Sequence, residues 1–232
     1  MRSMFRSVLL VLVAVIAVSA VAAASASAEP EWLINEKPVT ESTAVTFSKR
    51  SGSFFEMADK NSQLGAITIT CSGVTGKGTV APKGVGSITE FKLSKCYRTR
   101  IGGCKTQTQA EQESTEWVRM IHLSWPTKLT EEHNFGDWVG EEGPSRMGFE
   151  FECTNLLGGK MKDTCETEVT GLSPAVFTSL RWENETVVQT FTGLLGPTPP
   201  FKCSLGGAHS GEFYAAIVPK GPEGKKLSFK ET

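Results

Sequence analysis

The stretch Phe149-Glu150-Phe151-Glu152-Cys153 alternates apolar and acidic residues at each position. Successive side chains of a β-strand point to opposite faces of the sheet, so this pattern predicts a strand with one buried face. A similar period of two recurs in Ala66–Cys71, Trp117–Trp125 and Phe213–Val218. Glycine and proline clusters such as Thr75-Gly76-Lys77-Gly78 separate the runs as predicted turns, and no apolar stripe of helical period follows residue 28. We therefore predict an all-β fold, a disulfide-stapled antiparallel β-sandwich, with a barrel as the alternative.

The cysteines indicate a fold held together by disulfides. There are six of them, namely Cys71, Cys96, Cys104, Cys153, Cys165 and Cys203. Their even number in an exported chain predicts three disulfides. No C-x-x-C pair occurs, which argues against a zinc site and against a redox motif. Short spacing favours Cys96–Cys104 and Cys153–Cys165, which leaves Cys71–Cys203, although six cysteines allow many other pairings.

A bond between Cys153 and Cys165 would set the register of a hairpin. Phe151 would then face Thr167 on a side that suits the core. The other side would carry four glutamates in two facing pairs, Glu152 with Glu166 and Glu150 with Glu168. Like charges directly opposite each other destabilise a sheet, so this side needs compensation.

Four arrangements would relieve this repulsion. A neighbouring strand could supply Lys or Arg, with Arg119 as a candidate, or solvent and salt could screen an exposed face. The four carboxylates could instead bind a divalent cation such as Ca²⁺, or two of them could act as a glycosidase-like pair. We favour the first two arrangements. The secondary candidates for a cation site are Glu150, Glu152, Glu166 and Glu168; otherwise we assign no metal ligand, catalytic residue or cofactor.

Two tryptophans are candidates for contact with a glycan. Trp138 lies in the acidic stretch Thr130–Gly143, and Trp182 lies between charged neighbours, so both are expected to be exposed. An exposed indole can stack on the apolar face of a sugar ring, whereas the usual place of tryptophan is the edge of a core. The acidic stretch lacks the spacing of a calcium-binding loop.

Residues 1–28 are predicted to form a cleavable signal peptide. Arg2 and Arg6 give a basic start, an apolar run follows, and Ala26-Ser27-Ala28 provides an A-x-A cleavage site. An uncleaved anchor is the alternative, because Val8–Ala24 just reaches the length of a spanning helix. Cleavage would leave residues 29–232, which we expect to form a single all-β domain without a transmembrane segment.

The charge and the motifs exclude several classes of function. The formal net charge is −1 and no long Lys/Arg block occurs, so the chain as a whole has no electrostatic attraction to nucleic acid or anionic lipid. No recognisable catalytic, cofactor or nucleic-acid motif is present in the sequence.

Several pieces together resemble a group of uncharacterised secreted proteins of soil actinobacteria. They are Trp32-Leu33-Ile34-Asn35, Ile67–Ser72 with Thr75–Gly78, Leu123–Leu129, Phe151-Glu152-Cys153, and Cys203–Gly207 with Ser210-Gly211. The resemblance implies export and an extracellular or cell-surface location, and it transfers no functional residue. We predict a secreted, non-enzymatic protein that binds a glycan or a cell-surface protein. A small secreted hydrolase that uses a Glu pair and a purely structural envelope component are the alternatives.

Overall fold

The computed structural model describes residues 29–108, 116–130, 136–139, 146–167, 176–183, 186–192 and 201–230. The predicted signal peptide lies outside these ranges. Residues Pro30–Glu231 belong to one compact unit. Within the described ranges, no helix is long and apolar enough to cross a membrane.

The described chain is built from antiparallel β-strands. In chain order they are β1 (Glu31–Ile34), β2 (Lys37–Pro38), β3 (Thr43–Lys49), β4 (Phe55–Asp59), β5 (Ile67–Val80), β6 (Val85–Ile101), β7 (Val118–Ile121), β8 (Trp125–Thr130), β9 (Gly136–Val139), β10 (Gly148–Thr154), β11 (Lys160–Thr167), β12 (Val176–Glu183), β13 (Thr186–Thr192), β14 (Phe201–Cys203), β15 (Gly207–Lys220) and β16 (Leu227–Lys230). This confirms the prediction of an all-β, antiparallel, disulfide-stapled fold.

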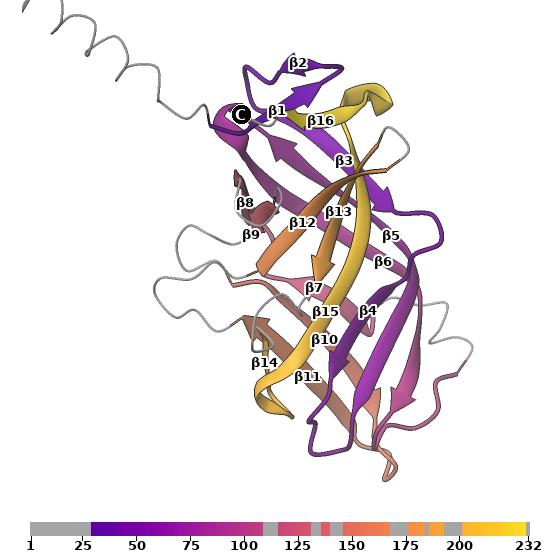
Figure 1. The fold of residues 1–232 in the computed structure, drawn as a ribbon. Helices are drawn as coiled ribbons and strands as arrows, with labels where there is room; N and C mark the ends of the chain where they lie inside the picture. Colours follow the sequence, from indigo (N-terminus) through magenta and orange to yellow (C-terminus); the bar gives the residue numbers. More distant parts are fainter. Residues whose placement is uncertain are drawn as a thin grey trace, which may run out of the picture. The chain divides into compact units, whose positions relative to one another are not determined.

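Three long strands, β5, β6 and β15, organise the large sheet (Figure 1). The first half of β15 pairs with β4 and β14, and its second half pairs with β3 and β13. The pairing of β13 with β15 closes a ring that runs through β12, β9, β8, β6, β5 and β3. The remaining strands, β14, β11, β10 and β7, continue the sheet from the first half of β15. The long strand β15 therefore belongs to both parts of the sheet.

A three-stranded sheet of β16, β1 and β2 lies beside the ring (Figure 1). Its apolar side chains, Trp32, Leu227 and Phe229, pack in one cluster with Val45 of β3 and Val187 of β13. This second sheet therefore covers apolar residues that the ring strands present at this end.

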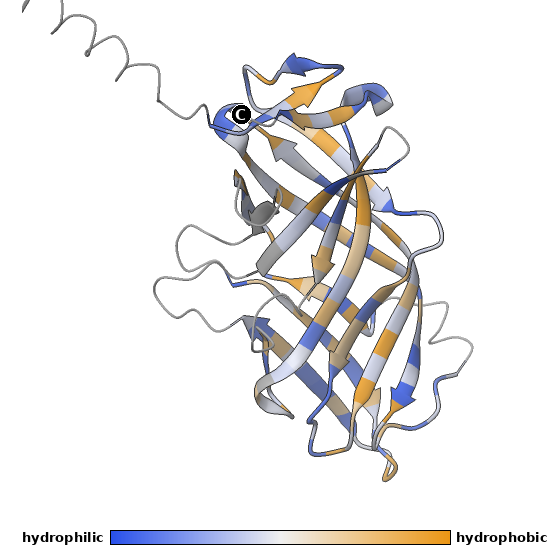
Figure 2. Cartoon of the chain, viewed as in Figure 1, coloured by the Kyte–Doolittle hydropathy of each residue, from blue (hydrophilic) through white to orange (hydrophobic). Residues whose placement is uncertain are grey.

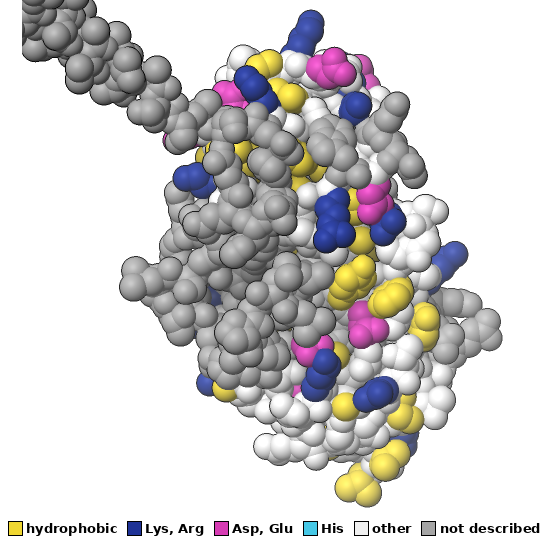
Figure 3. Space-filling model, in the orientation of Figure 1, with side chains coloured by type: hydrophobic (Ala, Val, Ile, Leu, Met, Phe, Trp, Pro, Cys, Tyr) yellow, Lys and Arg dark blue, Asp and Glu magenta, His cyan; other side chains and the backbone are white. Residues whose placement is uncertain are grey.

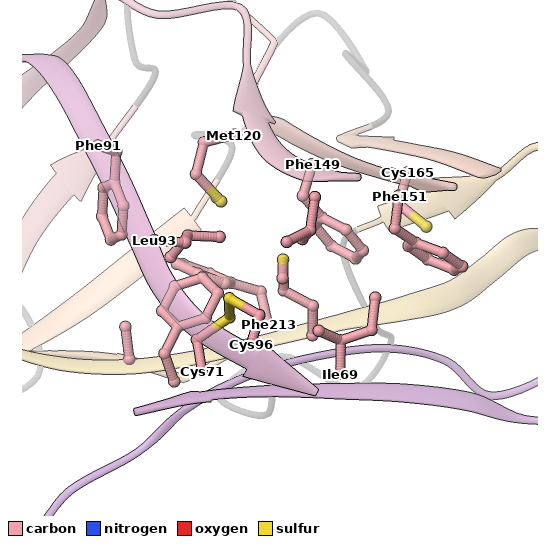
Figure 4. Packing of buried hydrophobic residues seen from close by; sticks show 14 of the residues in the cluster. Ile69, Cys71, Phe91, Leu93, Cys96, Met120, Phe149, Phe151, Cys165 and Phe213 are labelled. Carbon is pink, nitrogen blue, oxygen red and sulfur yellow. A yellow bond between two sulfur atoms is a disulfide. The ribbon is translucent and has the colours of Figure 1, made fainter. Parts of the chain in front are cut away.

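The main core is a cluster of apolar side chains that is rich in aromatic rings and in sulfur (Figure 4). Alternating residues of β5 and β6 point into it, and hydrophilic and hydrophobic segments alternate along strands of the sheet in Figure 2. Buried residues of β10 and β15 complete it. Phe91 lies at its centre, with its ring 5.1 Å from that of Phe47 and 5.6 Å from that of Phe55, measured between centroids. The core is thus built from residues far apart in the sequence.

The prediction of a turn at Thr75–Gly78 is wrong, because these residues lie within β5. Gly76 is opposite Phe47 on β3 and opposite Phe91 on β6. A β-carbon added at Gly76 would lie 2.1 Å from the ring of Phe47 and 2.3 Å from the carbonyl oxygen of Glu90. The glycine is required by this close approach and not by a reversal of the chain.

We expect Gly76→Ala to lower the free energy of unfolding by about 1.5 kcal/mol, because the added methyl group overpacks this point of the core. The matched control is Gly221→Ala, where the nearest atom to an added β-carbon is 3.3 Å away. Urea unfolding of both variants measures the effect. Equal stability of the two would contradict the steric requirement at Gly76.

The run Trp117–Trp125 is not one strand as predicted. The chain leaves the sheet after β7 and returns at β8, and His122 between them has a positive φ of 60°. A positive φ is incompatible with an extended strand, so the alternation in this run is interrupted at His122.

All six cysteines form disulfides, but the pairs differ from the short-range ones that spacing favoured. The bonds join Cys71 with Cys96, Cys104 with Cys153, and Cys165 with Cys203. Cys71 lies directly opposite Cys96 on β5 and β6, and Cys165 lies opposite Cys203 on β11 and β14. Strand pairing decides the connectivity. Three disulfides are typical of proteins that fold in an oxidising compartment.

The register of the hairpin between β10 and β11 also differs from the predicted one. Phe151 faces Asp163, and not Thr167, while Glu152 faces Lys162. The reason is the tight turn that follows Asn155, whose backbone N–H donates to the carbonyl oxygen of Gly159. This turn closes the hairpin before Cys153 can reach Cys165. The predicted facing of Glu150 with Glu168 and of Glu152 with Glu166 is therefore wrong.

Candidate functional site

Glu150 is compensated by two cations. Its carboxylate forms ion pairs with Arg119 of β7 and with Lys162 of β11. Burial raises the pKa of this carboxyl, but hydrogen bonds and charges from Lys162 and Arg119 outweigh burial, so the pKa is lower than its ordinary value. Arg119, one candidate named from the sequence, thus pairs with Glu150, although the facing glutamate pairs that it was meant to compensate do not form.

Glu166 is compensated in the same way on the next strand. Its Oε1 lies 2.7 Å from Nε2 of His122, and its Oε2 accepts a hydrogen bond of 3.1 Å from Arg146. The hydrogen bond from His122 lowers the pKa of Glu166, partial burial raises it, and Arg146 lowers it further, so that the pKa falls below its ordinary value.

The two glutamates are therefore poorly suited to the chemistry considered for them. A glycosidase acid needs a raised pKa to stay protonated, and both pKa values are lowered. Their oxygens already accept hydrogen bonds from Arg119, Lys162, Arg146 and His122, which leaves little of them for a metal ion. Glu152 is exposed opposite Lys162. Glu168 lies outside the described residues.

The tryptophans proposed for glycan contact are only partly placed. Trp138 belongs to β9 and Trp182 to β12, but their side chains lie outside the described part of the structure. The proposal for these two residues therefore stays a prediction.

A buried pair of carboxyl groups was not anticipated as a site. Asp59 at the end of β4 is 0% exposed, and Asp163 on β11 is 1% exposed. Oδ1 of Asp59 accepts from the backbone N–H of Asn61 at 3.1 Å. Oδ1 of Asp163 accepts from the hydroxyl of Ser204 at 2.8 Å and from the N–H of Leu205 at 3.1 Å. The bonds of Asp163 join β11 to the turn after β14, whereas the bond of Asp59 is local to the end of β4.

A hydrogen-bond and a charge interaction with Asp163 both act on Asp59, and we infer that a proton held by Asp59 lies between the two carboxyl groups. Within the described ranges, Oδ2 of each group receives no hydrogen bond from a donor. The pKa of Asp59 is raised from 3.8 to about 6, first by burial and then by the hydrogen bond and charge of Asp163, against a smaller lowering by hydrogen bonds from Asn61 and Ser210. A proton on Asp59 supplies the missing donor between the two orphan oxygens.

The carboxyl pair is an internal link and not an open site. Both groups are almost fully shielded from solvent, and a β-carbon at Gly206 would lie 2.1 Å from Oδ1 of Asp59. Asp163 is also near Cys165 and Cys203, but these sulfur atoms are bonded to each other and are not available as metal ligands. The alternation of Asp163 with Cys165 in the sequence is the signal that could have revealed its inward direction.

A hollow of about 420 Å³ lies across four neighbouring strands, β15, β3, β5 and β6. Strand pairing arranges its outward residues in two rows across the sheet. One row is Lys220, Thr46, Lys77 and Glu90, and the other is Val218, Ser48, Thr75 and Lys92. Adjacent strands are about 4.8 Å apart, so each row presents closely spaced polar groups. We refer to these eight residues as the groove.

The groove carries an excess of positive charge. Nζ of Lys77 and Nζ of Lys92 lie 3.7 Å and 3.3 Å from the oxygens of Glu90. Both lysine side chains are about two-thirds exposed, at 64% and 67%, so these ion pairs are weak and the ammonium groups can turn to another anion. Lys220 stands at the opposite end of the first row. Three hydroxyl groups lie between the lysines and can donate or accept hydrogen bonds.

Sequence reasoning missed the groove because it assigned Lys77 to a turn. The rows exist only when the register of the strands is known, and no local pattern marks them. No family model, curated protein or solved structure matches the chain. The function is therefore argued from the groove itself.

Proposed function

We propose that the protein is secreted and binds an acidic polysaccharide of a cell surface through the groove, without catalysing a reaction. The observation that carries this proposal is the pair of polar rows on β15, β3, β5 and β6. Three ammonium groups, one carboxylate and three hydroxyls suit a ligand with both anionic groups and hydroxyls. An acidic polysaccharide combines the two.

Export is supported by two independent features. The sequence begins with the pattern of a signal peptide, and all six cysteines are in disulfides. The resemblance to secreted proteins of soil actinobacteria adds a bacterial envelope as the proposed setting.

The shape of the groove favours a polymer over a small molecule. It is open, it spans four strands, and its polar groups are spread along rows and do not converge on one point. Small-molecule sites are typically enclosed and largely apolar. A chain of sugar units lying across the strands could contact each row in turn.

We expect the double variant Lys77→Glu, Lys220→Glu to bind polygalacturonate about tenfold more weakly than the unmodified protein, because each exposed ion pair contributes up to about 1 kcal/mol. The probe is soluble polygalacturonate, with neutral dextran as the uncharged comparison, and titration calorimetry measures the affinity. Binding should weaken as salt is added, since salt screens exposed charges.

The matched control is Lys128→Glu, which reverses the charge of an exposed strand lysine on β8 outside the groove. This variant should bind polygalacturonate like the unmodified protein. Equal affinity of the groove variant and the control for polygalacturonate would contradict the proposal, and so would equal binding of dextran and polygalacturonate.

A further inference from the structure

Two adjacent leucines are exposed at the turn between β10 and β11. The side chain of Leu156 is 70% exposed and that of Leu157 is 96% exposed. The turn forms the lower end of the molecule in Figure 1, and apolar side chains occupy this end in Figure 3. A single exposed leucine needs no explanation, but two together at the tip of a turn form an apolar point that solvent surrounds.

This tip is held in place by hydrogen bonds and a disulfide. The N–H of Gly158 donates to the carbonyl oxygen of Asn155 at 3.0 Å, and the N–H of Gly159 donates to Oδ1 of Asn155 at 2.8 Å. The disulfide of Cys104 with Cys153 joins the hairpin to the segment after β6. Docking therefore requires little further ordering of the backbone, which favours binding.

The segments around the tip carry cations and no acidic residue. Residues 60–66, 100–108 and 154–162 contain no Asp or Glu, and their basic residues are Lys60, Arg100, Lys105, Lys160 and Lys162. The segments are neighbours, because a β-carbon at Gly103 would touch the side chain of Leu64, and Cys104 forms a β-bridge with Asn155.

Four of these five cations fall into two groups. Lys60 and Lys162 form ion pairs with Glu212 and Glu150 farther from the tip. Lys105 and Lys160 are exposed beside the turn itself, and Nζ of Lys105 is 3.9 Å from the place of a β-carbon on Gly158. The tip thus combines two leucines with ammonium groups at its base. The near-neutral net charge of the chain conceals this local excess.

We propose that this tip docks on an anionic lipid bilayer, with Leu156 and Leu157 entering the acyl boundary and Lys105 and Lys160 contacting lipid phosphates. A pocket of another protein would accept the leucines, but it gives no reason for a base of cations without a carboxylate. An anionic bilayer matches both features, since its interior is apolar and its surface is negative. The tip shares no residue with the groove, so this proposal can be tested independently of polysaccharide binding.

The test is cosedimentation of the exported protein with lipid vesicles. Its N-terminus is first checked by mass spectrometry, because an uncleaved leader would itself bind lipid. Vesicles of phosphatidylcholine and phosphatidylglycerol in equal parts are compared with vesicles of phosphatidylcholine alone. We expect at least tenfold stronger partitioning to the anionic vesicles, because each nearby cation raises it by about fivefold.

Variants separate the two components of the tip. Leu156→Ser with Leu157→Ser should reduce partitioning at least tenfold, and Lys105→Gln with Lys160→Gln should remove the preference for phosphatidylglycerol. The control is Val85→Ser, which removes another exposed apolar side chain on β6 and should bind normally. Unchanged melting temperatures show that the variants are folded. The groove variant Lys77→Glu, Lys220→Glu should still bind vesicles.

Two results would overturn the proposal. One is undiminished vesicle binding by the double serine variant, which would place the contact elsewhere on the protein. The other is the absence of any preference for vesicles with phosphatidylglycerol, whether the protein partitions equally to both kinds or to neither. In that case the tip would have to bind a protein partner or have no ligand.

Discussion

Raising the pH is expected to remove about 3 kcal/mol from the free energy of unfolding through Asp59 alone, of which about 2 kcal/mol is lost between pH 4 and 7. Burial and the nearby Asp163 raise the pKa of Asp59 to about 6 in the folded protein, from 3.8. Between these values the folded protein holds a proton that the unfolded chain has lost. The contribution is therefore complete below pH 3.8 and disappears as the pH passes 6.

The variant Asp59→Asn should abolish this pH dependence. The amide can donate a hydrogen bond to Oδ2 of Asp163 at every pH, while its oxygen can still accept from the N–H of Asn61. We expect the variant to be more stable than the unmodified protein near pH 7.5 and about equal to it near pH 4. Urea unfolding at a series of pH values measures the difference between the two proteins.

Other carboxylates act in the opposite direction and must be separated from Asp59. The pKa values of Glu150 and Glu166 are lowered, so their contribution is present above the ordinary pKa of 4.5 and is lost at lower pH. The difference between Asp59→Asn and the unmodified protein cancels them. Glu223→Gln, at an exposed ion pair with Lys225, serves as the control and should leave the pH profile unchanged. A parallel profile for Asp59→Asn and the unmodified protein would show that the carboxyl pair holds no shared proton.

Local patterns in the sequence were enough to predict several of the strands and which of their faces is buried. Phe149, Phe151 and Cys153 all point inward from β10, as their alternation predicted. The number of disulfides also followed from composition. These features depend on the geometry of a single strand, which the sequence encodes directly.

Features that depend on which strands pair with each other could not be predicted from local patterns. Cys165 bonds to Cys203 because β14 pairs with β11, and nothing near either cysteine indicates that pairing. The meeting of Asp59 with Asp163 and the rows of the groove likewise arise from strands that are distant in the sequence. Lys77 was missed for a local reason. Its neighbouring glycines resemble a turn in the sequence, but Gly76 allows close packing within β5.

Replacing Phe91 with alanine should cost about 3–5 kcal/mol of stability, the largest effect of any variant considered. Its ring has three further aromatic neighbours besides Phe47 and Phe55. It lies 6.0 Å from the ring of Trp125, 6.4 Å from that of Phe213 and 6.5 Å from that of Phe191, and Gly76 is directly opposite it. These residues come from β5, β8, β13 and β15, so no single element can move to fill the cavity.

Phe91→Leu keeps most of the volume and should cost clearly less, which separates the cavity from the loss of an aromatic ring. Phe54→Ala is the exposed control, because this ring is 49% exposed, and its effect should stay below about 1 kcal/mol.

Phe91 also lies under the strands that carry the groove. At a temperature where Phe91→Ala is still folded, polygalacturonate should therefore stabilise it, since a ligand that binds only the folded state raises the unfolding midpoint. A cost for Phe91→Ala no greater than that for Phe54→Ala would show that this ring does not organise the core.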